Sequence, residues 1–204
     1  MTRFAGLTGA TLPTAPVVCH ECIFWQSKTG RSVDKRRWIR GTEDEWGAWG
    51  TVYYDDDGRL LGSMQYGPSD LFPRAAELPA GPPGEDAVLV TCAYLVDPSK
   101  PWVMQSLFLT AIGEARERGA RALEAFAYRY GDEASSFDRF HVHKTIFPHD
   151  FLADFGFVTA RAQGRVELAR LELGGLVPVV EGKRERVLRV VRDAFVPAPA
   201  PQRF

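Results

Sequence analysis

The pattern of hydrophobic and polar positions predicts a hairpin and a central strand in the first half of the chain. Two β-prone segments, residues 51–54 and 60–66, flank the turn pair Asp57-Gly58, a combination typical of a β-hairpin. Gly62 inside the second segment indicates a bulge or a close approach of another backbone. Residues 87–96 carry almost no polar side chain, so we expect a strand in the middle of a sheet with both faces covered.

A helix and a second strand follow this central strand. Apolar side chains recur at the helical period over residues 103–118, and Gly119 is placed to end that helix. Residues 122–128 then predict a short strand. The order strand, helix, strand implies a right-handed crossover, so we expect residues 87–96 and 122–128 to lie parallel.

The remaining segments complete a mixed α/β (α+β) single domain, with a twisted sheet of six or seven strands. We expect a poorly ordered arm over 1–16, a strand or buried turn over 17–25, a helix over 33–46 with a possible restart at Thr42, and a surface loop over 67–86. The rest is a loop over 131–149, a short helix over 151–155, strands over 158–162 and 166–173, the domain boundary near 180, an amphipathic helix over 181–196 and a disordered tail over 197–204.

Composition argues against a nucleic-acid-binding, membrane-spanning or secreted protein. The 204 residues include 25 basic and 26 acidic side chains, a net charge of −1, so no global positive field favours nucleic acid. No apolar run approaches the roughly 18 residues that span a bilayer, and the first residues do not resemble a secretion signal. With three cysteines, we expect a reduced, cytoplasmic protein, a monomer or homodimer with no nucleic-acid or membrane partner.

The chain from about Trp49 to Leu173 resembles the GNAT superfamily of acyl-CoA-dependent N-acyltransferases. The resemblance rests on the central strand 87–96, on the helix that ends with Arg118-Gly119-Ala120, and on the short helix 151–157 with its terminal Gly-Phe. A narrower resemblance, to a divergent actinobacterial-type branch, rests on Cys19-x-x-Cys22-x-Phe24-Trp25, Arg37-Trp38, Trp46-Gly47 and Phe72-Pro73-Arg74-Ala75.

The resemblance implies direct acetyl transfer from acetyl-CoA to an amine in a ternary complex. It implies a V-shaped slot between the fourth and fifth strands, with the pantetheine arm held by main-chain groups of Tyr94, Leu95 and Val96, and the pyrophosphate at the start of the next helix. Polar side chains there are Lys100, Gln105 and Ser106. The acceptor would be a small-molecule or protein amine.

Two departures from the family pattern leave a second function open. The phosphate loop contains no glycine, Pro101 has no N–H to donate, and Trp102 is bulky where backbone must approach phosphate. The tyrosine that acts as general acid in many relatives is replaced by Leu152, between Phe151 and Phe155. The alternative is a catalytically silent GNAT-like module that binds a ligand or a protein.

Glu124 is the candidate general base, because a carboxylate in an apolar strand is costly without a partner. The alternative is an ion pair with Arg129 or Arg121. Other candidates are weaker, and each has a structural alternative. Four of them are the loop residues Asp132, Glu133, His141 and His143, and Cys19 and Cys22 could bind zinc together with the two histidines. The tryptophans Trp25, Trp38, Trp46 and Trp49 could line an aromatic acceptor pocket. The basic residues Lys35, Arg36, Arg37 and Arg40 could form an anion site, and the basic C-terminal helix could dock a partner.

For the cysteines, the alternative to zinc is a pair of buried thiols packed with Phe24 and Trp25. For the tryptophans it is core packing, and for the basic residues it is a solvated helix face. No metal is therefore assigned at this stage.

Overall fold

The computed structural model describes residues 3–29, 32–130 and 146–174. These belong to a compact unit that ends at Gly174, and residues 175–204 lie outside the described part. The predicted C-terminal helix, the tail and the loop residues 131–145 therefore lie outside the described residues. Within them, no helix is both long and apolar enough to cross a membrane.

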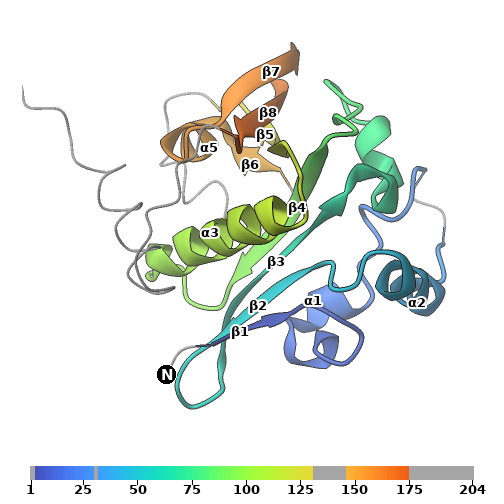
Figure 1. Ribbon diagram of the computed structural model, residues 1–204, viewed down its shortest axis with the longest axis vertical. Helices are drawn as coiled ribbons and strands as arrows, with labels where there is room; N and C mark the ends of the chain where they lie inside the picture. Colours follow the sequence, from blue (N-terminus) through green and yellow to red (C-terminus); the bar gives the residue numbers. More distant parts are fainter. Residues whose placement is uncertain (1–2, 30–31, 131–145, 175–204) are drawn as a thin grey trace, which may run out of the picture. The chain divides into compact units, whose positions relative to one another are not determined.

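One mixed, eight-stranded sheet organises the unit, in the order β1-β2-β3-β4-β5-β8-β7 with β6 also paired to β5 (Figure 1). The neighbours β4 and β5 are parallel, whereas β5 and β8 are antiparallel. The mixed sheet and its parallel centre confirm the predicted fold class. The strands are β1 (Arg3–Gly6), β2 (Gly50–Tyr54), β3 (Leu60–Pro68), β4 (Ala87–Leu95), β5 (Ala122–Tyr128), β6 (Phe147–Pro148), β7 (Val158–Gln163) and β8 (Val166–Glu172).

The first residues are not the poorly ordered arm that their composition predicts. β1 pairs antiparallel with β2, and Phe4 stacks on Tyr53 with 4.1 Å between ring centroids. The edge of a buried strand and an aromatic partner outweigh the weak local preference of a small, polar segment. The strand or buried turn expected over 17–25 is also wrong, because it begins with the four-residue helix α1 (Val17–His20).

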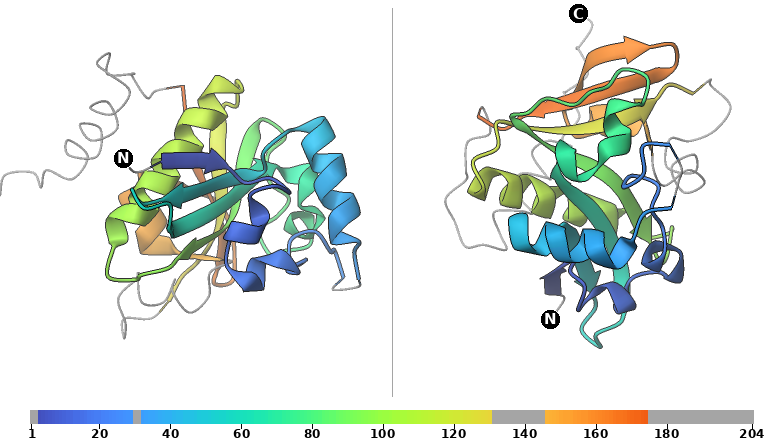
Figure 2. Two further views of the ribbon diagram at one scale, coloured as in Figure 1. Left: turned by 90° about the horizontal axis from the view of Figure 1, so that it is seen from below. Right: turned by 90° about the vertical axis from the view of Figure 1, so that its right-hand side faces the viewer.

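The helix α2 (Lys35–Glu45) confirms the helix predicted over 33–46. Its N-cap is Asp34, whose carboxylate accepts a hydrogen bond of 3.0 Å from the Arg37 N–H. No restart occurs at Thr42, which is buried within one continuous helix. Here α2 and residues 7–22 together are called the N-terminal cover. It packs on the face of the sheet opposite α3 (Figures 1 and 2).

Aromatic side chains attach this cover to the sheet. Trp38 of α2 meets Trp49 edge-on, with centroids 5.4 Å apart, and its indole N–H donates to the Leu71 carbonyl over 3.0 Å. Trp25 and Trp49 are almost completely buried. The core interpretation of the tryptophans is therefore correct, and it also explains why the loop segment around Phe72 is apolar.

The helix α3 (Pro101–Glu117) covers the other face of β2, β3 and β4 (Figure 1). At Gly62, an added Cβ would lie 2.7 Å from the Tyr94 carbonyl oxygen and 3.0 Å from Val103 of α3. The close approach predicted at this glycine is confirmed. The strand β3 also shows the expected irregularity, because the β2–β3 register shifts between Tyr53 and Tyr54.

The helix α5 (His149–Asp154) follows β6 and brings a cluster of phenylalanines against α3. Phe108 of α3 lies 5.4 Å from Phe147 and 4.8 Å from Phe155, measured between ring centroids. Apolar packing thus holds β6 and the end of α5 against α3.

Candidate functional site

The parallel ladder between β4 and β5 ends well before either strand does. Residues Ala87 to Val90 pair with Ala122 to Ala125, but β4 continues to Leu95 and β5 to Tyr128. Beyond the ladder, β5 keeps β8 on one edge and acquires β6 on the other, with Ala127 opposite Phe147. The expected divergence of the fourth and fifth strands is present, and β6 borders the opening on the β5 side.

A bulge marks the place where β4 leaves its neighbour. Consecutive residues Gln65 and Tyr66 of β3 pair with Cys92 and Val90, so Thr91 is an extra residue in β4. The Thr91 hydroxyl donates to the Gln65 carbonyl over 3.2 Å. Because the last β4–β5 pair is Val90 with Ala125, bulge and divergence begin at adjacent residues.

The pairing of β4 with β3 shows which main-chain groups face the opening. The Val96 N–H donates to the Leu61 carbonyl over 3.0 Å, and antiparallel pairs alternate between bonded and non-bonded. Tyr94, two residues back and opposite Ser63, therefore directs its main chain at β3. Ala93 and Leu95 direct theirs to the other edge, toward the opening.

This alternation corrects part of the predicted set. Of Tyr94, Leu95 and Val96, only Leu95 has an amide turned toward the opening, and Ala93, which sequence reasoning missed, joins it. The signal that could have found Ala93 is the strand period of two, but the starting phase depends on the register with β3.

In the turn before α3, most of the polar side chains bind one another. Asp97 accepts hydrogen bonds from the Ser99 N–H at 2.9 Å and the Ser99 hydroxyl at 2.6 Å, and the Lys100 ammonium lies 3.6 Å from its other oxygen. The hydrogen bonds from Ser99 hold the pKa of Asp97 below its ordinary value. An ionised carboxylate therefore lies beside Lys100, the predicted phosphate ligand.

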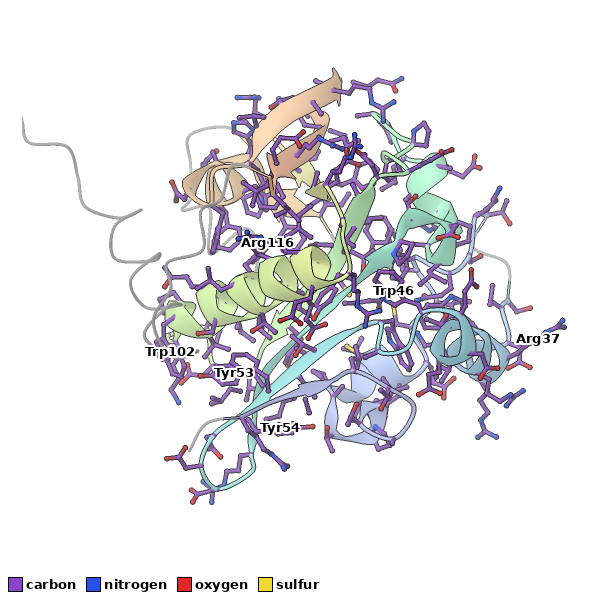
Figure 3. All side chains as sticks on the ribbon, viewed as in Figure 1. Arg37, Trp46, Tyr53, Tyr54, Trp102 and Arg116 are labelled. Carbon is purple, nitrogen blue, oxygen red and sulfur yellow. The ribbon has the colours of Figure 1, made fainter. Side chains whose placement is uncertain are left out.

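Trp102 does not fill the opening between β4 and β5. Its ring meets Tyr53 of β2 edge-on, with centroids 5.9 Å apart (Figure 3), and β3 separates β2 from β4. Gln105 and Ser106, the other predicted ligands, are half-buried on the second turn of α3. Leu152 of α5 is 1% exposed, so the position of the missing tyrosine is apolar core.

Glu124 lies in the paired part of β4 and β5, opposite Leu89, and its side chain reaches the segment just before β4. One carboxylate oxygen accepts the Gly84 N–H at 2.7 Å and the other accepts Arg170 Nη1 at 3.0 Å. Arg170 also pairs with Asp86 at 2.9 Å and with Glu172 at 2.6 Å, and these contacts raise its pKa. The ion-pair alternative describes Glu124, although its partner is Arg170 rather than Arg129 or Arg121.

A cavity of about 110 Å³ lies between the N-terminal cover and the open part of the sheet. Its floor includes Ser63 and Gln65 of β3 and Ala93 and Tyr94 of β4, and its walls include Lys35 of α2. The cavity therefore borders the same stretch of β4 that has left β5, on the face opposite α3.

The cysteines converge at this cavity but are not the buried pair expected. Cys19, Cys22 and Cys92 all line it, yet Cys22 is exposed. Burial raises the pKa of the Cys92 thiol to about 12, so that thiol stays protonated. No group of three or more metal-ligating side chains occurs among the described residues, and His141, His143, Asp132 and Glu133 lie outside them.

The basic residues of α2 separate into two groups. Arg36, Arg37 and Arg40 are exposed, as the solvated-face interpretation predicts, and Arg37 projects from the outer side of α2 (Figure 3). Lys35 is only 9% exposed, and its ammonium donates to the Cys22 carbonyl over 2.7 Å. Nothing in the local sequence distinguishes Lys35 from the arginines that follow it.

A second buried carboxylate, Glu167 of β8, was also missed. It accepts hydrogen bonds from Arg129 Nε at 2.7 Å, Thr159 Oγ1 at 2.7 Å and His149 Nδ1 at 2.8 Å. Burial alone raises its pKa, but these partners outweigh burial and hold the pKa below its ordinary value. Its partners come from β7, α5 and the end of β5, so this network links β8 and β7 to α5, which follows β6 on the other edge of β5.

Comparisons with known proteins find similar solved structures at low sequence identity. No family model and no curated protein matches the chain. A solved GNAT-family acetyltransferase from Desulfovibrio desulfuricans is 16% identical, covering 85% of this chain and 100% of its own, with a TM-score of 0.49. An N-acetyltransferase from Staphylococcus aureus is 15% identical over 85% of this chain and 99% of its own, with a TM-score of 0.46. An acetyltransferase from Acinetobacter baylyi is 15% identical over 85% and 92%, with a TM-score of 0.48.

Proposed function

We propose that this protein transfers an acetyl group from acetyl-CoA to an amine. The observation that carries the proposal is the open edge of β4. A bulge at Thr91 and the end of the ladder at Val90 leave the main chain of Ala93 and Leu95 directed away from β3. Such an edge suits an extended, amide-containing arm, which binds a strand by main-chain hydrogen bonds.

The acceptor would approach β4 from the face of the sheet opposite α3. The cavity floored by Ala93 and Tyr94 would bring an amine beside the same strand, which supplies the proximity that transfer requires. In the reaction the amine nitrogen bonds to the thioester carbonyl carbon and the carbon–sulfur bond breaks. The nitrogen loses a proton and the thiolate gains one. The N–H groups of Ala93 and Leu95 are the candidate donors to the carbonyl oxygen.

The nucleotide end of the co-substrate would be held less firmly. At the start of α3, Pro101 has no N–H to offer a phosphate, and Asp97 already engages Ser99 and Lys100. The helix dipole and the Lys100 ammonium remain as attractive elements. We therefore expect acetyl-CoA affinity to depend mainly on the acyl and pantetheine portion.

A second candidate function is a module that binds an acyl or peptide-like arm without turnover. It is favoured by the turn at Asp97, where the carboxylate already engages Ser99 and Lys100. Leu152 in place of a phenol points the same way, because no described side chain of α5 at that position can return a proton. The two functions share the open edge of β4. They differ in whether an added amine releases free thiol.

Amide hydrogen exchange, followed by NMR on the full chain with and without acetyl-CoA, tests the proposal. We expect acetyl-CoA to slow exchange at Ala93 and Leu95, while Tyr94 and Val96, whose amides face β3, serve as internal controls. Unchanged exchange at both residues, together with no measurable binding heat, would exclude the open edge as the site. A thiol-release assay with an amine panel then separates transfer from binding alone.

A further inference from the structure

The cavity on the N-terminal cover contains two hydrogen-bond donors with unused capacity and, among its described lining residues, no acid. Its lining is otherwise mostly apolar, with Leu7, Leu12 and Trp49 among the side chains. Lys35 contributes an ammonium and Gln65 contributes an amide. A cavity with this chemistry selects a ligand that is apolar along its length and negatively charged at one end.

Lys35 is a buried cation with an incomplete set of partners. One of its three N–H groups donates to the Cys22 carbonyl, and the Trp38 ring lies 4.9 Å from the ammonium. Among the described residues no carboxylate forms an ion pair with it, and Glu21 acts on it only over a longer range. Burial lowers the pKa of Lys35, which is the expected consequence of a charge that lacks a counter-ion.

Gln65 provides the second donor. Its amide nitrogen is buried and, among the described residues, has no hydrogen-bond partner, whereas its amide oxygen accepts a weak hydrogen bond from the Cys92 thiol at 3.8 Å. Buried donors without partners are uncommon and costly. A carboxylate offers two acceptor oxygens, so one such group can satisfy both the amide and the ammonium.

We propose that this cavity binds the carboxylate end of the acceptor, so that the acceptor is a primary amine carrying a carboxylate at the far end of a short apolar chain. The inference rests on the proposed acetyl transfer and adds the substrate class. The amine end would lie beside Ala93 and Tyr94, where β4 is open, and the carboxylate would lie between Lys35 and Gln65.

The test uses the wild-type full chain and three ligands of equal length that differ at one end. These are 4-aminobutanoate, butylamine and 1,4-diaminobutane, with the three- to six-carbon homologues of each as a length series. We expect the ω-amino carboxylates to bind at least about tenfold more tightly than alkylamines of equal length. The diamines should bind most weakly, because their second ammonium would meet Lys35. An alkylamine or diamine that binds as tightly as the carboxylate would overturn the proposal.

Variants locate the effect. Lys35→Met keeps the unbranched, apolar stem of the side chain but removes the ammonium, so it should abolish the preference for the carboxylate. Lys28→Met is the matched control, because Lys28 is exposed and pairs with Glu77 at 4.0 Å, and it should change nothing. Gln65→Leu gives an independent readout if Lys35→Met does not fold. A preference that survives both cavity variants would contradict the proposal.

Binding is measured by titration without acetyl-CoA, so this inference and the proposed function can fail separately. A chain that binds 4-aminobutanoate but not acetyl-CoA keeps the carboxylate site and loses the transferase proposal. A chain that releases thiol with diamines and not with ω-amino carboxylates keeps the transferase and loses the carboxylate site.

Discussion

The two ends of the β4–β5 pair are built in opposite ways. At the amino end, side-chain charges hold the strands: Glu124 of β5 accepts from Arg170 and from the Gly84 N–H just before β4. At the carboxyl end, the bulge at Thr91 and the end of the ladder leave main-chain groups directed into an opening. The ladder between the strands has only four residue pairs, and the contacts of Glu124 supplement it.

The two ends also differ in their chemistry. The anchored end has a buried acid, but both of its oxygens already accept hydrogen bonds. The open end has few charges, but the main chain of Ala93 and Leu95 has no backbone partner on the β5 side among the described residues, and a cavity lies beside it. Reactivity is therefore expected where the backbone is free, and stability where the carboxylate is paired.

The largest expected effect comes from breaking the anchored end. Arg170→Met leaves the carboxylate of Glu124, 3% exposed, without its counter-ion, and we expect the free energy of unfolding to fall by about 3–5 kcal/mol. Urea unfolding measures the change. Glu172→Gln removes an exposed partner of the same arginine and should cost less than about 1 kcal/mol. Equal stability of Arg170→Met and wild type would show that the network does not anchor the strands.

The next effect concerns the contact between α3 and the open end. In Gly62→Ala the new methyl group would lie too close to the Tyr94 carbonyl oxygen and Val103, and we expect a loss of about 1–3 kcal/mol. Gly113→Ala on α3 is the control, because nothing lies within 4 Å of its added Cβ. That variant should gain up to about 1 kcal/mol through helix propensity. Thermal unfolding of both variants checks the sign of each change.

Glu167 offers a smaller effect with a defined pH dependence. Its pKa lies below the ordinary value, so its stabilisation is complete above the unfolded-state pKa of about 4.3 and is lost as pH falls through the lower folded-state pKa. We expect Glu167→Gln to cost about 1–2 kcal/mol at pH 7, and the difference from wild type to narrow below about pH 4. Urea unfolding at several pH values measures it. A difference that stays constant with pH would contradict the ionised state assigned to Glu167.

The smallest expected effect concerns the turn at Asp97, near the open end of β4, and the affinity for acetyl-CoA. Asp97→Ala frees Ser99 and Lys100 at the start of α3, and we expect acetyl-CoA to bind about two- to fivefold more tightly. Calorimetric titration at low salt measures the change, and it should shrink as ionic strength rises. Asp44→Ala is the control, because Asp44 is an exposed acid on α2 and is far in sequence from the turn before α3. Weaker binding in Asp97→Ala would mean that Asp97 organises the turn for the ligand rather than competing with it.

Several elements followed directly from the sequence, and others did not. The hairpin, the central strand β4, the helix α3 and the strand β5 each carry a strong periodic pattern and a turn signal, so their identity was predictable. The strand β1 and the helix α1 were not, because both segments are short. β1 acquires its structure by pairing with β2, and the β-prone residues Val17 and Val18 lie in a four-residue helix instead of a strand. The partner of Glu124 was missed for a similar reason, since Arg170 lies 46 residues away in sequence.

The sequence alone determined that this chain builds a mixed sheet with a parallel central pair, because periodicity and crossover handedness are local or nearly local properties. Only the tertiary structure decided which amides of β4 face the opening, which lysine is buried and which carboxylates are paired. Those facts depend on strand register and on contacts between distant segments, and a shift of register by one residue would reverse every one of those main-chain orientations.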